Sequence, residues 1–306
     1  AFHRPDAADA DLPVRLSESD VAAFPAIACL DDRFLPLDQV RVSPLDRGFL
    51  FADGVYEVVP VYDGRLYRLQ PHLDRLARSL DAIRLPLSRD WGALLQELVE
   101  RNGGGDLSVY LQITRGASAV RDHAFPPPDT APTVFAMARP LKAPDPWVLQ
   151  EGLSAVSVPD IRWGACHVKS IALLPNVLAR QAAVEQGADD AVLVRDGILT
   201  ETSAGNLYLV RAGVIRTPRP DHRILHGITR GVVLELAAAA GVACREEDIP
   251  AAALAEADEI WTSSSTKELL PVTRIDGRSV GTGRPGPVWQ QLWQAFQTCK
   301  RESAND

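Results

Sequence analysis

Apolar and polar residues recur along the chain with two periods, one typical of strands and one typical of helices. Runs rich in β-formers at Val55–Tyr62 and Arg65–Leu69 flank Asp63-Gly64, a dipeptide typical of hairpin turns. Apolar residues at helical spacing then predict helices over Pro71–Ile83 and Trp91–Arg101. The same patterns predict further strands at Leu107–Thr114, Thr133–Ala138, Leu153–Val158, Ala191–Val194, Ile198–Thr200, Asn206–Val210, Val214–Thr217 and Ile260–Thr262, and further helices at Asn176–Gln186, Arg230–Ala240 and Val288–Thr298.

The order of these elements indicates the fold class and the domain organisation. Strands grouped in hairpins and interrupted by single helices are typical of α+β domains, not of a doubly wound parallel sheet. The chain has 306 residues, enough for two domains, and three prolines between positions 140 and 146 mark a candidate linker. We therefore expect a loosely structured extension over 1–30, a small domain over 31–139, a linker over 140–147 and a large domain over 148–306.

Composition and charge narrow the classes of partner. With 46% hydrophobic and 24% charged residues, the chain is typical of globular proteins. Its net charge of −8 argues against nucleic acid or an anionic membrane as the main partner. The four cysteines lie far apart and form no CxxC pair, so we expect no zinc site. No secretory signal and no bilayer-length apolar run is visible, and we expect a cytoplasmic protein.

Lys169 is the first candidate for chemistry. Of the 32 lysines and arginines in the chain only four are lysines, and Lys169 lies between two apolar segments. A lysine amine is the group that forms a Schiff base with a carbonyl cofactor. Glu201 follows downstream in Thr200-Glu201-Thr202, and a carboxylate of this kind can keep a pyridine nitrogen protonated. The two residues together suggest a pyridine aldehyde as cofactor.

Three segments have the chemistry of a phosphate site. Gly227-Ile228-Thr229-Arg230 opens a predicted helix, whose free N–H groups and positive end favour an anion. Five consecutive hydroxyl residues, 262–266, follow a short apolar strand. Arg75 lies on a predicted helix, opposite its apolar stripe, and arginine can bind phosphate oxygens through two donors.

In this order, these features resemble the fold-type IV, or class IV, aminotransferases that depend on pyridoxal 5'-phosphate. The resemblance extends from Asp32 to Phe296, nearly the whole chain. It implies a small α/β domain and a larger, β-barrel-like domain with helices that binds the cofactor. The motifs that carry it are Asp46-Arg47-Gly48, Gly54-Val55-Tyr56-Glu57, His72-Leu73-Asp74-Arg75-Leu76, Lys169-Ser170, Glu201-Thr202-Ser203-x-x-Asn206 and Gly227-Ile228-Thr229-Arg230.

The resemblance also assigns roles to individual residues. It implies that Lys169 forms the Schiff base and carries protons, and that Glu201 binds the pyridine nitrogen. It implies that Leu225 packs against the cofactor ring. The residues that it implies for the phosphate are Arg75, Ile228, Thr229, Ser264 and Ser265.

One loop narrows the substrate. After Thr114-Arg115-Gly116, the pair Arg121 and His123 resembles the carboxylate-binding pair of the D-amino-acid transaminases, which works with a tyrosine matching Tyr56. In that group the loop enters the active site of the partner subunit, so the resemblance implies a homodimer. Four residues separate Gly116 from Arg121, one more than in the family pattern, which affects the expected substrate range more than the cofactor.

The leading hypothesis is ping-pong transamination from a D-alanine-like donor to 2-oxoglutarate. Within the same fold, the alternatives are a branched-chain L-amino-acid aminotransferase, an (R)-amine transaminase and an aminodeoxychorismate lyase. A cofactor-binding carrier or regulator without turnover is the alternative from a different class. The presence of both Lys169 and Glu201 argues against a degenerate site.

Overall fold

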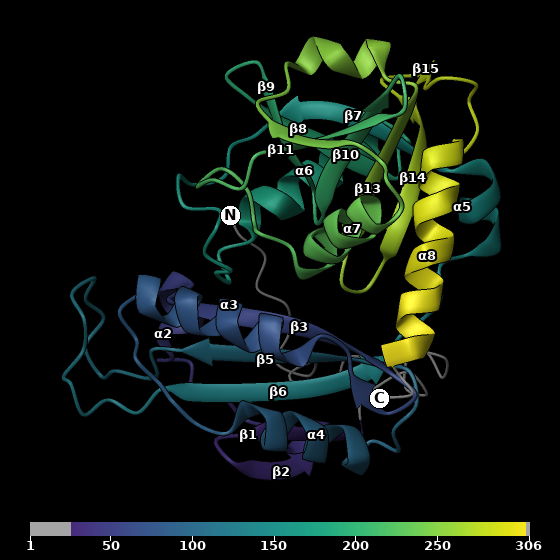
Figure 1. The fold of residues 1–306 in the computed structure, drawn as a ribbon. Helices are drawn as coiled ribbons and strands as arrows, with labels where there is room; N and C mark the ends of the chain where they lie inside the picture. The colour runs from purple at the N-terminus through teal and green to yellow at the C-terminus, as the bar shows by residue number, and fades with distance from the viewer. Residues whose placement is uncertain (1–25, 304–306) are drawn as a thin grey trace, which may run out of the picture.

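A computed structural model describes residues 26–303 of the chain, which form two β-sheets with helices packed against them (Figure 1). Most of the extension predicted over 1–30 lies outside the described residues. Strand β1 (Ile27–Leu30) falls inside that prediction and corrects it: Ala28 and Cys29 are fully buried because β1 pairs with β6 (Thr133–Pro140).

The first sheet is antiparallel throughout, with the strand order β2-β1-β6-β5-β3-β4. Along β5, odd-numbered residues are buried and even-numbered ones are mostly partly buried, as expected where helices cover one face. The core of this sheet joins apolar side chains of β3 and β5 to those of α3 and α4. The elements not yet bounded are β2 (Arg33–Pro36), β3 (Gly54–Tyr62), β4 (Arg65–Leu66), β5 (Leu107–Thr114), α3 (Leu69–Ala82) and α4 (Trp91–Arg101).

The second sheet closes on itself. Its order is β12-β11-β10-β13-β14-β7-β8-β9, and β9 pairs in turn with β10, so that β10, β13, β14, β7, β8 and β9 form a ring. The α+β class and the barrel-like shape expected for the larger part of the chain are therefore confirmed. The strands are β7 (Leu153–Pro159), β8 (Asp190–Arg195), β9 (Ile198–Thr202), β10 (Asn206–Arg211), β11 (Val214–Pro218), β12 (Cys244–Glu247), β13 (Glu259–Ser264), β14 (Glu268–Ile275) and β15 (Arg278–Ser279).

Helices pack around the ring and join it to the first sheet. The core between α7 and α8 contains the stacked Tyr208 and Trp261 rings. Helix α8 runs from the ring towards the first sheet (Figure 1), where the Phe296 ring lies 6.3 Å from that of Tyr67. None of the helices among residues 26–303 is long and apolar enough to cross a membrane. The remaining helices are η1 (Leu37–Gln39), α2 (Arg47–Phe51), α5 (Pro146–Glu151), α6 (Leu174–Glu185), α7 (Ile228–Ala239), η2 (Ala251–Glu256) and α8 (Pro287–Ser303).

Strand β14 and the predicted linker are two of the segments that differ from the sequence-based expectation. Strand β14 was not predicted because Pro271 interrupts its pattern, yet β14 lies between β13 and β7. The predicted linker 140–147 is partly structured: residue 140 ends β6, and α5 begins at Pro146 with Asp145 as its N-cap. The predicted domain boundaries otherwise stay a prediction.

Candidate active site

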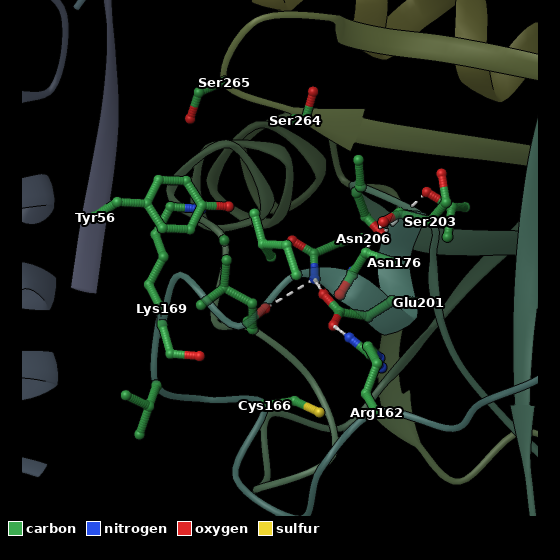
Figure 2. A pocket seen from close by; sticks show the side chains of 18 of the residues that line it. Tyr56, Arg162, Cys166, Lys169, Asn176, Glu201, Ser203, Asn206, Ser264 and Ser265 are labelled. Atoms are coloured by element: carbon green, nitrogen blue, oxygen red, sulfur yellow. Dashed lines mark hydrogen bonds and ion pairs between the residues drawn. The ribbon is translucent and has the colours of Figure 1, made fainter. Parts of the chain in front are cut away.

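One pocket lies between the first sheet and the ring of strands. Its walls come from β3, α3, the segment between β7 and α6, the β9–β10 turn, the start of α7 and the end of β13. The space inside these walls, counted together with open solvent at the mouth, amounts to about 950 Å³. Figure 2 shows Lys169 and Glu201 on opposite sides of this space.

Lys169 is held by its backbone and keeps its amine free. Its N–H donates to Ser79 Oγ at 3.2 Å, and its carbonyl accepts from Tyr56 N at 3.0 Å. The amine lies 4.2 Å from the centre of the Tyr56 ring. Within residues 26–303, Lys169 forms no ion pair. A partly buried amine without a counter-charge is available for covalent chemistry.

Glu201 lies at the other side of the pocket, buried near the end of β9. Its Oε1 accepts a hydrogen bond from Asn206 Nδ2 at 3.0 Å, and its Oε2 accepts one from Arg162 Nη1 (Figure 2). Asn206 also donates to the carbonyl of Leu225 at 2.8 Å, which fixes this backbone at the pocket. Burial raises the pKa of Glu201 above its ordinary value, and the charge of Arg162 acts in the opposite direction.

Arg75 enters the pocket from α3 as part of a buried ionic cluster. Its Nε and Nη2 donate to the two oxygens of Glu57, both at 2.8 Å, and its Nη1 donates to the His226 carbonyl at 3.1 Å. His72 Nδ1 lies 2.8 Å from Glu57 Oε2. Since a guanidinium has five N–H groups, Arg75 is fixed in orientation and still has donors for an anion.

The N-terminus of α7 lines the same pocket through Gly227, Ile228 and Thr229. No side chain caps this helix, so its first N–H groups are available as donors. A Cβ at position 227 would lie 2.0 Å from Asn206 Oδ1, so this approach requires glycine. Ser264 and Ser265 lie at the end of the pocket that is uppermost in Figure 2.

The donor set fits pyridoxal 5'-phosphate. An amine can meet its aldehyde, a buried carboxylate can meet its ring nitrogen, and a helix N-terminus with an arginine can meet its phosphate. Tyr56 and Leu225 also line the pocket and supply ring and aliphatic surface. The structure thus brings nine predicted residues to one pocket: Tyr56, Arg75, Lys169, Glu201, Leu225, Ile228, Thr229, Ser264 and Ser265.

Arg121 and His123 are the two predicted residues that do not line this pocket. Both are exposed on the loop between β5 and β6. The Arg121 guanidinium lies 4.8 Å from the centre of the Phe51 ring, and the His123 ring lies 5.2 Å from it. Arg47 holds this loop by donating to the Asp122 carbonyl at 2.6 Å. Within a single chain, the expected carboxylate-binding pair therefore stands apart from Lys169.

Several pocket residues were not selected from the sequence. Arg162 contacts Glu201 but lies 39 positions before it, so no local spacing reveals the pair. Asn206 was noted only as part of a motif, and Asn176, which donates to the Ser203 carbonyl at 2.9 Å, was not noted. The nearest sequence signal for Arg162 is the Asp160-x-Arg162 pattern just beyond the predicted strand.

Comparison with known proteins agrees with this geometry. The family model for amino-transferase class IV matches residues 54–275. A D-alanine aminotransferase of Staphylococcus haemolyticus is 37% identical over 270 residues, which cover 87% of this chain and 95% of that protein.

Solved structures extend the comparison to the fold. The branched-chain amino acid aminotransferase of Escherichia coli superposes with a TM-score of 0.84 at 25% identity and covers 90% of this chain and 94% of its own. A second branched-chain amino acid aminotransferase, from T.th. and solved with pyridoxamine 5'-phosphate, gives 0.82 at 26% identity with the same coverage. Because the family model spans most of the sequence and includes both Lys169 and Glu201, the chain belongs to the class IV aminotransferases, enzymes that depend on pyridoxal 5'-phosphate.

Proposed function

We propose that this enzyme transfers the amino group of a D-alanine-like amino acid to 2-oxoglutarate by a ping-pong mechanism. The observation that carries the proposal is the placement of Lys169 and Glu201 across one pocket whose walls also include Arg75 and the start of α7 (Figure 2). An amine and a carboxylate separated by room for a ring are what transamination requires.

When bound, pyridoxal 5'-phosphate supplies an aldehyde that captures the substrate amine and a ring that accepts the electron pair left on the substrate Cα. Glu201 holds a proton at the ring nitrogen. Lys169 attaches the cofactor through Nζ, and once released it moves a proton from the substrate Cα. The side chain of Leu225 packs against the ring.

The phosphate is held by fixed donors, which we assign to Arg75, the backbone of Ile228 and Thr229, the Thr229 hydroxyl, and the hydroxyls of Ser264 and Ser265. Arg75 is oriented in advance by Glu57, so little side-chain entropy is lost when the phosphate binds. The positive end of α7 adds a sequence-independent attraction for the anion.

The choice of a D-amino acid is supported by the relatives named D-alanine aminotransferase, at 36–40% identity over most of the chain. The solved structures named branched-chain aminotransferases are more distant, at 25–26% identity. The substrate test below has four competing outcomes: an L-branched-chain substrate, an (R)-amine, lyase chemistry, or cofactor binding without turnover.

We also propose that two chains form a homodimer in which Arg121 and His123 reach the partner's pocket and bind the substrate carboxylate with Tyr56. Two observations support this arrangement. Arg121 and His123 are exposed away from their own pocket. Large apolar side chains are also exposed on α2, on the β5–β6 loop and on α6: Phe49 is 77% exposed, Val120 70% and Leu174 68%.

The first experiment screens the reductive half-reaction. Purified enzyme is mixed with D-amino acids, L-amino acids and (R)-amines while loss of the cofactor's visible absorbance is followed. We expect D-alanine to react fastest, and borohydride treatment to leave the cofactor mass on Lys169. Rapid loss with L-leucine or (R)-phenylethylamine and none with D-alanine would replace the substrate assignment. Cofactor mass on another lysine would overturn the assignment of the site.

The second experiment tests whether the site is shared. Arg121→Ala removes a charged hydrogen-bond donor worth about 1.5–3 kcal/mol, so KM for D-alanine should rise roughly 10- to 150-fold. Lys169→Ala should abolish turnover. If the loop acts in the partner's pocket, mixing the two variants should restore activity, because one pocket of each mixed dimer keeps both residues. Absence of recovery in verified mixed dimers would refute the shared site, and Arg278→Ala on exposed β15 is the matched control.

A further inference from the structure

Arg162 is a buried arginine on the segment between β7 and α6, and its side chain is 9% exposed. Its Nη1 donates to Glu201 Oε2. Its Nη2 donates to Asp160 Oδ2 at 2.8 Å and to the Arg223 carbonyl at 3.1 Å, and its Nε donates to Asp160 Oδ1 at 2.9 Å. Only one arm of this guanidinium thus points to the pocket.

Asp160 fixes Arg162 from the side away from the pocket. Its side chain is fully buried and accepts hydrogen bonds from Nε and Nη2 of Arg162 and from the Thr200 hydroxyl at 2.8 Å. It also forms an ion pair with Arg195 at 3.0 Å. Against burial, which alone would raise it, the hydrogen bonds and charge of Arg162 lower the pKa of Asp160 to about 2. Asp160 is therefore ionised and holds Arg162 rigidly.

Glu201 depends on this cation for its charge. Both of its oxygens are buried, and its hydrogen-bond partners besides Arg162, the Asn206 amide and the Leu225 backbone N–H, are neutral. The Lys169 amine is the other cation that lowers the pKa of Glu201, and it acts more weakly than Arg162. A buried carboxylate without a cation takes up a proton at higher pH than an exposed one. A protonated Glu201 can no longer balance a positive charge at a ring nitrogen, and the ring then accepts electrons less well.

We propose that Arg162 is a positioning residue that keeps Glu201 ionised and turned towards the ring nitrogen, with Asp160 as its buried counter-charge. This inference rests on the proposed role of Glu201 at the cofactor. It assigns Arg162 no contact with the substrate. Its effect passes through the proton that Glu201 holds at the ring nitrogen.

A purely structural role for Arg162 has different consequences. Arg162 also anchors its segment through the Arg223 carbonyl, so its loss could loosen the segment that carries Lys169. Arg195 provides the matched control because its Nη2 donates to the Arg162 carbonyl at 2.9 Å and pairs with Asp160, but it does not contact Glu201. Loosening of the segment is expected in both variants, whereas loss of charge on Glu201 is expected only in Arg162→Gln.

The experiment binds pyridoxal 5'-phosphate labelled with 15N in its ring to the whole enzyme and follows the nitrogen NMR shift against pH. In the wild type and in Arg195→Gln, the ring nitrogen should stay protonated across neutral pH. In Arg162→Gln, the ring nitrogen should lose its proton at a pH at least about one unit lower than in the wild type, which is a tenfold change in the ratio of protonated to unprotonated ring. We expect kcat for D-alanine to fall roughly tenfold or more, with KM changed by less than about threefold.

Arg162→Lys covers the case in which Arg162→Gln does not fold. Lysine keeps the charge and loses the two-point contact with Asp160, so the nitrogen should remain protonated. Three results would overturn the proposal. The ring nitrogen of Arg162→Gln could lose its proton at the same pH as in the wild type, or this pH could fall equally in Arg162→Gln and Arg195→Gln. The third result is a ring nitrogen that is no longer protonated at neutral pH in Arg162→Lys.

The test is independent of the substrate assignment. The nitrogen signal requires bound cofactor but no turnover, so a failed reaction with D-alanine leaves it interpretable. A failure of the proposed cofactor site would be visible in the wild type, as absence of cofactor mass on Lys169, before any variant is made.

Discussion

Two buried arginine–glutamate pairs contribute to the same pocket with their roles reversed. In the first pair, Arg75 lines the pocket and Glu57 lies behind it. In the second pair, Glu201 presents the carboxylate, and Arg162, which also lines the pocket, is anchored by Asp160. The same two residue types thus present a positive group and a negative group to one pocket, which we propose meet a phosphate and a ring nitrogen.

The two glutamates differ in pKa because the two pairs differ in geometry. Glu57 receives two parallel donors from Arg75 and one contact from His72. These outweigh its burial and lower its pKa from 4.5 to about 2. Glu201 receives a single arm of Arg162, and burial dominates, so that its pKa is raised. A carboxylate that accepts two donors from one arginine stays ionised and fixed, whereas a carboxylate that accepts one arginine donor can share a proton with a ligand.

The largest expected effect comes from neutralising the carboxylate in the pocket. Glu201→Gln keeps the shape but cannot hold a proton at the ring nitrogen as a charged base does. We expect kcat to fall on the order of 10²- to 10⁴-fold, the range of a positioned acid–base group, with cofactor still attached to Lys169. Single-turnover absorbance measurements would check this, and a near-normal rate would show that the carboxylate charge is not required.

The second prediction breaks the other pair. Arg75→Gln removes the proposed phosphate donor, and the affinity for pyridoxal 5'-phosphate should fall by about 3 kcal/mol, roughly 100-fold. It also leaves Glu57 buried without its cation, which costs about 3–5 kcal/mol of folding free energy. The double variant with Glu57→Gln should regain stability without regaining affinity.

Cofactor titrations and urea unfolding of the apo-enzyme would separate the two effects. Pyridoxal without its phosphate provides the control, since its binding should be nearly equal in the wild type and in Arg75→Gln. An equal loss of affinity for pyridoxal would show that Arg75 shapes the whole pocket and does not act on the phosphate.

Helices and strands were predictable from the sequence where the hydrophobic periodicity and the residues that cap or end the element agree. Helix α4 and strand β5 match their predicted bounds to the residue: Asp90 caps α4, and β5 alternates regularly. Strand β14 escaped prediction because Pro271 removes a backbone donor from its centre. The closure of the ring by the β9–β10 pair is a long-range property that no periodicity encodes.

The residues of the candidate site also fall into a group that the sequence predicts and a group that it does not. Lys169, Glu201 and the start of α7 lie in short motifs, and the structure places them at one pocket. Arg162 and Asp160 belong to no such motif, and the contact of Arg162 with Glu201 exists only after β7 and β9 are brought together through β8. Residues that touch a ligand tend to carry a local signal, whereas the charges that tune them come from the fold.

The smallest expected effect is the pH dependence of stability, and it sharpens the difference between the two glutamates. The folded-state pKa of Glu57 lies below its ordinary value, so the folded state favours the ionised form. Its contribution, roughly 3 kcal/mol, is present above about pH 4.5 and is lost as pH falls towards 2. The stability gap between wild type and Glu57→Gln in the apo-enzyme should therefore narrow between pH 5 and pH 3.

Glu201 should show the opposite sign. Because its folded-state pKa is raised, its ionised form costs stability at neutral pH, and Glu201→Gln should make the apo-enzyme more stable there but not at low pH. Urea unfolding from pH 3 to pH 8 measures both gaps, with the exposed Glu235 that pairs with Arg68 as the surface control. If the two glutamine variants shifted stability in the same direction at pH 7, the two pairs would not differ in the way that their geometry indicates. The pocket would then hold two equivalent anchors, and the distinction between a fixed counter-charge and a proton-sharing carboxylate would have to be abandoned.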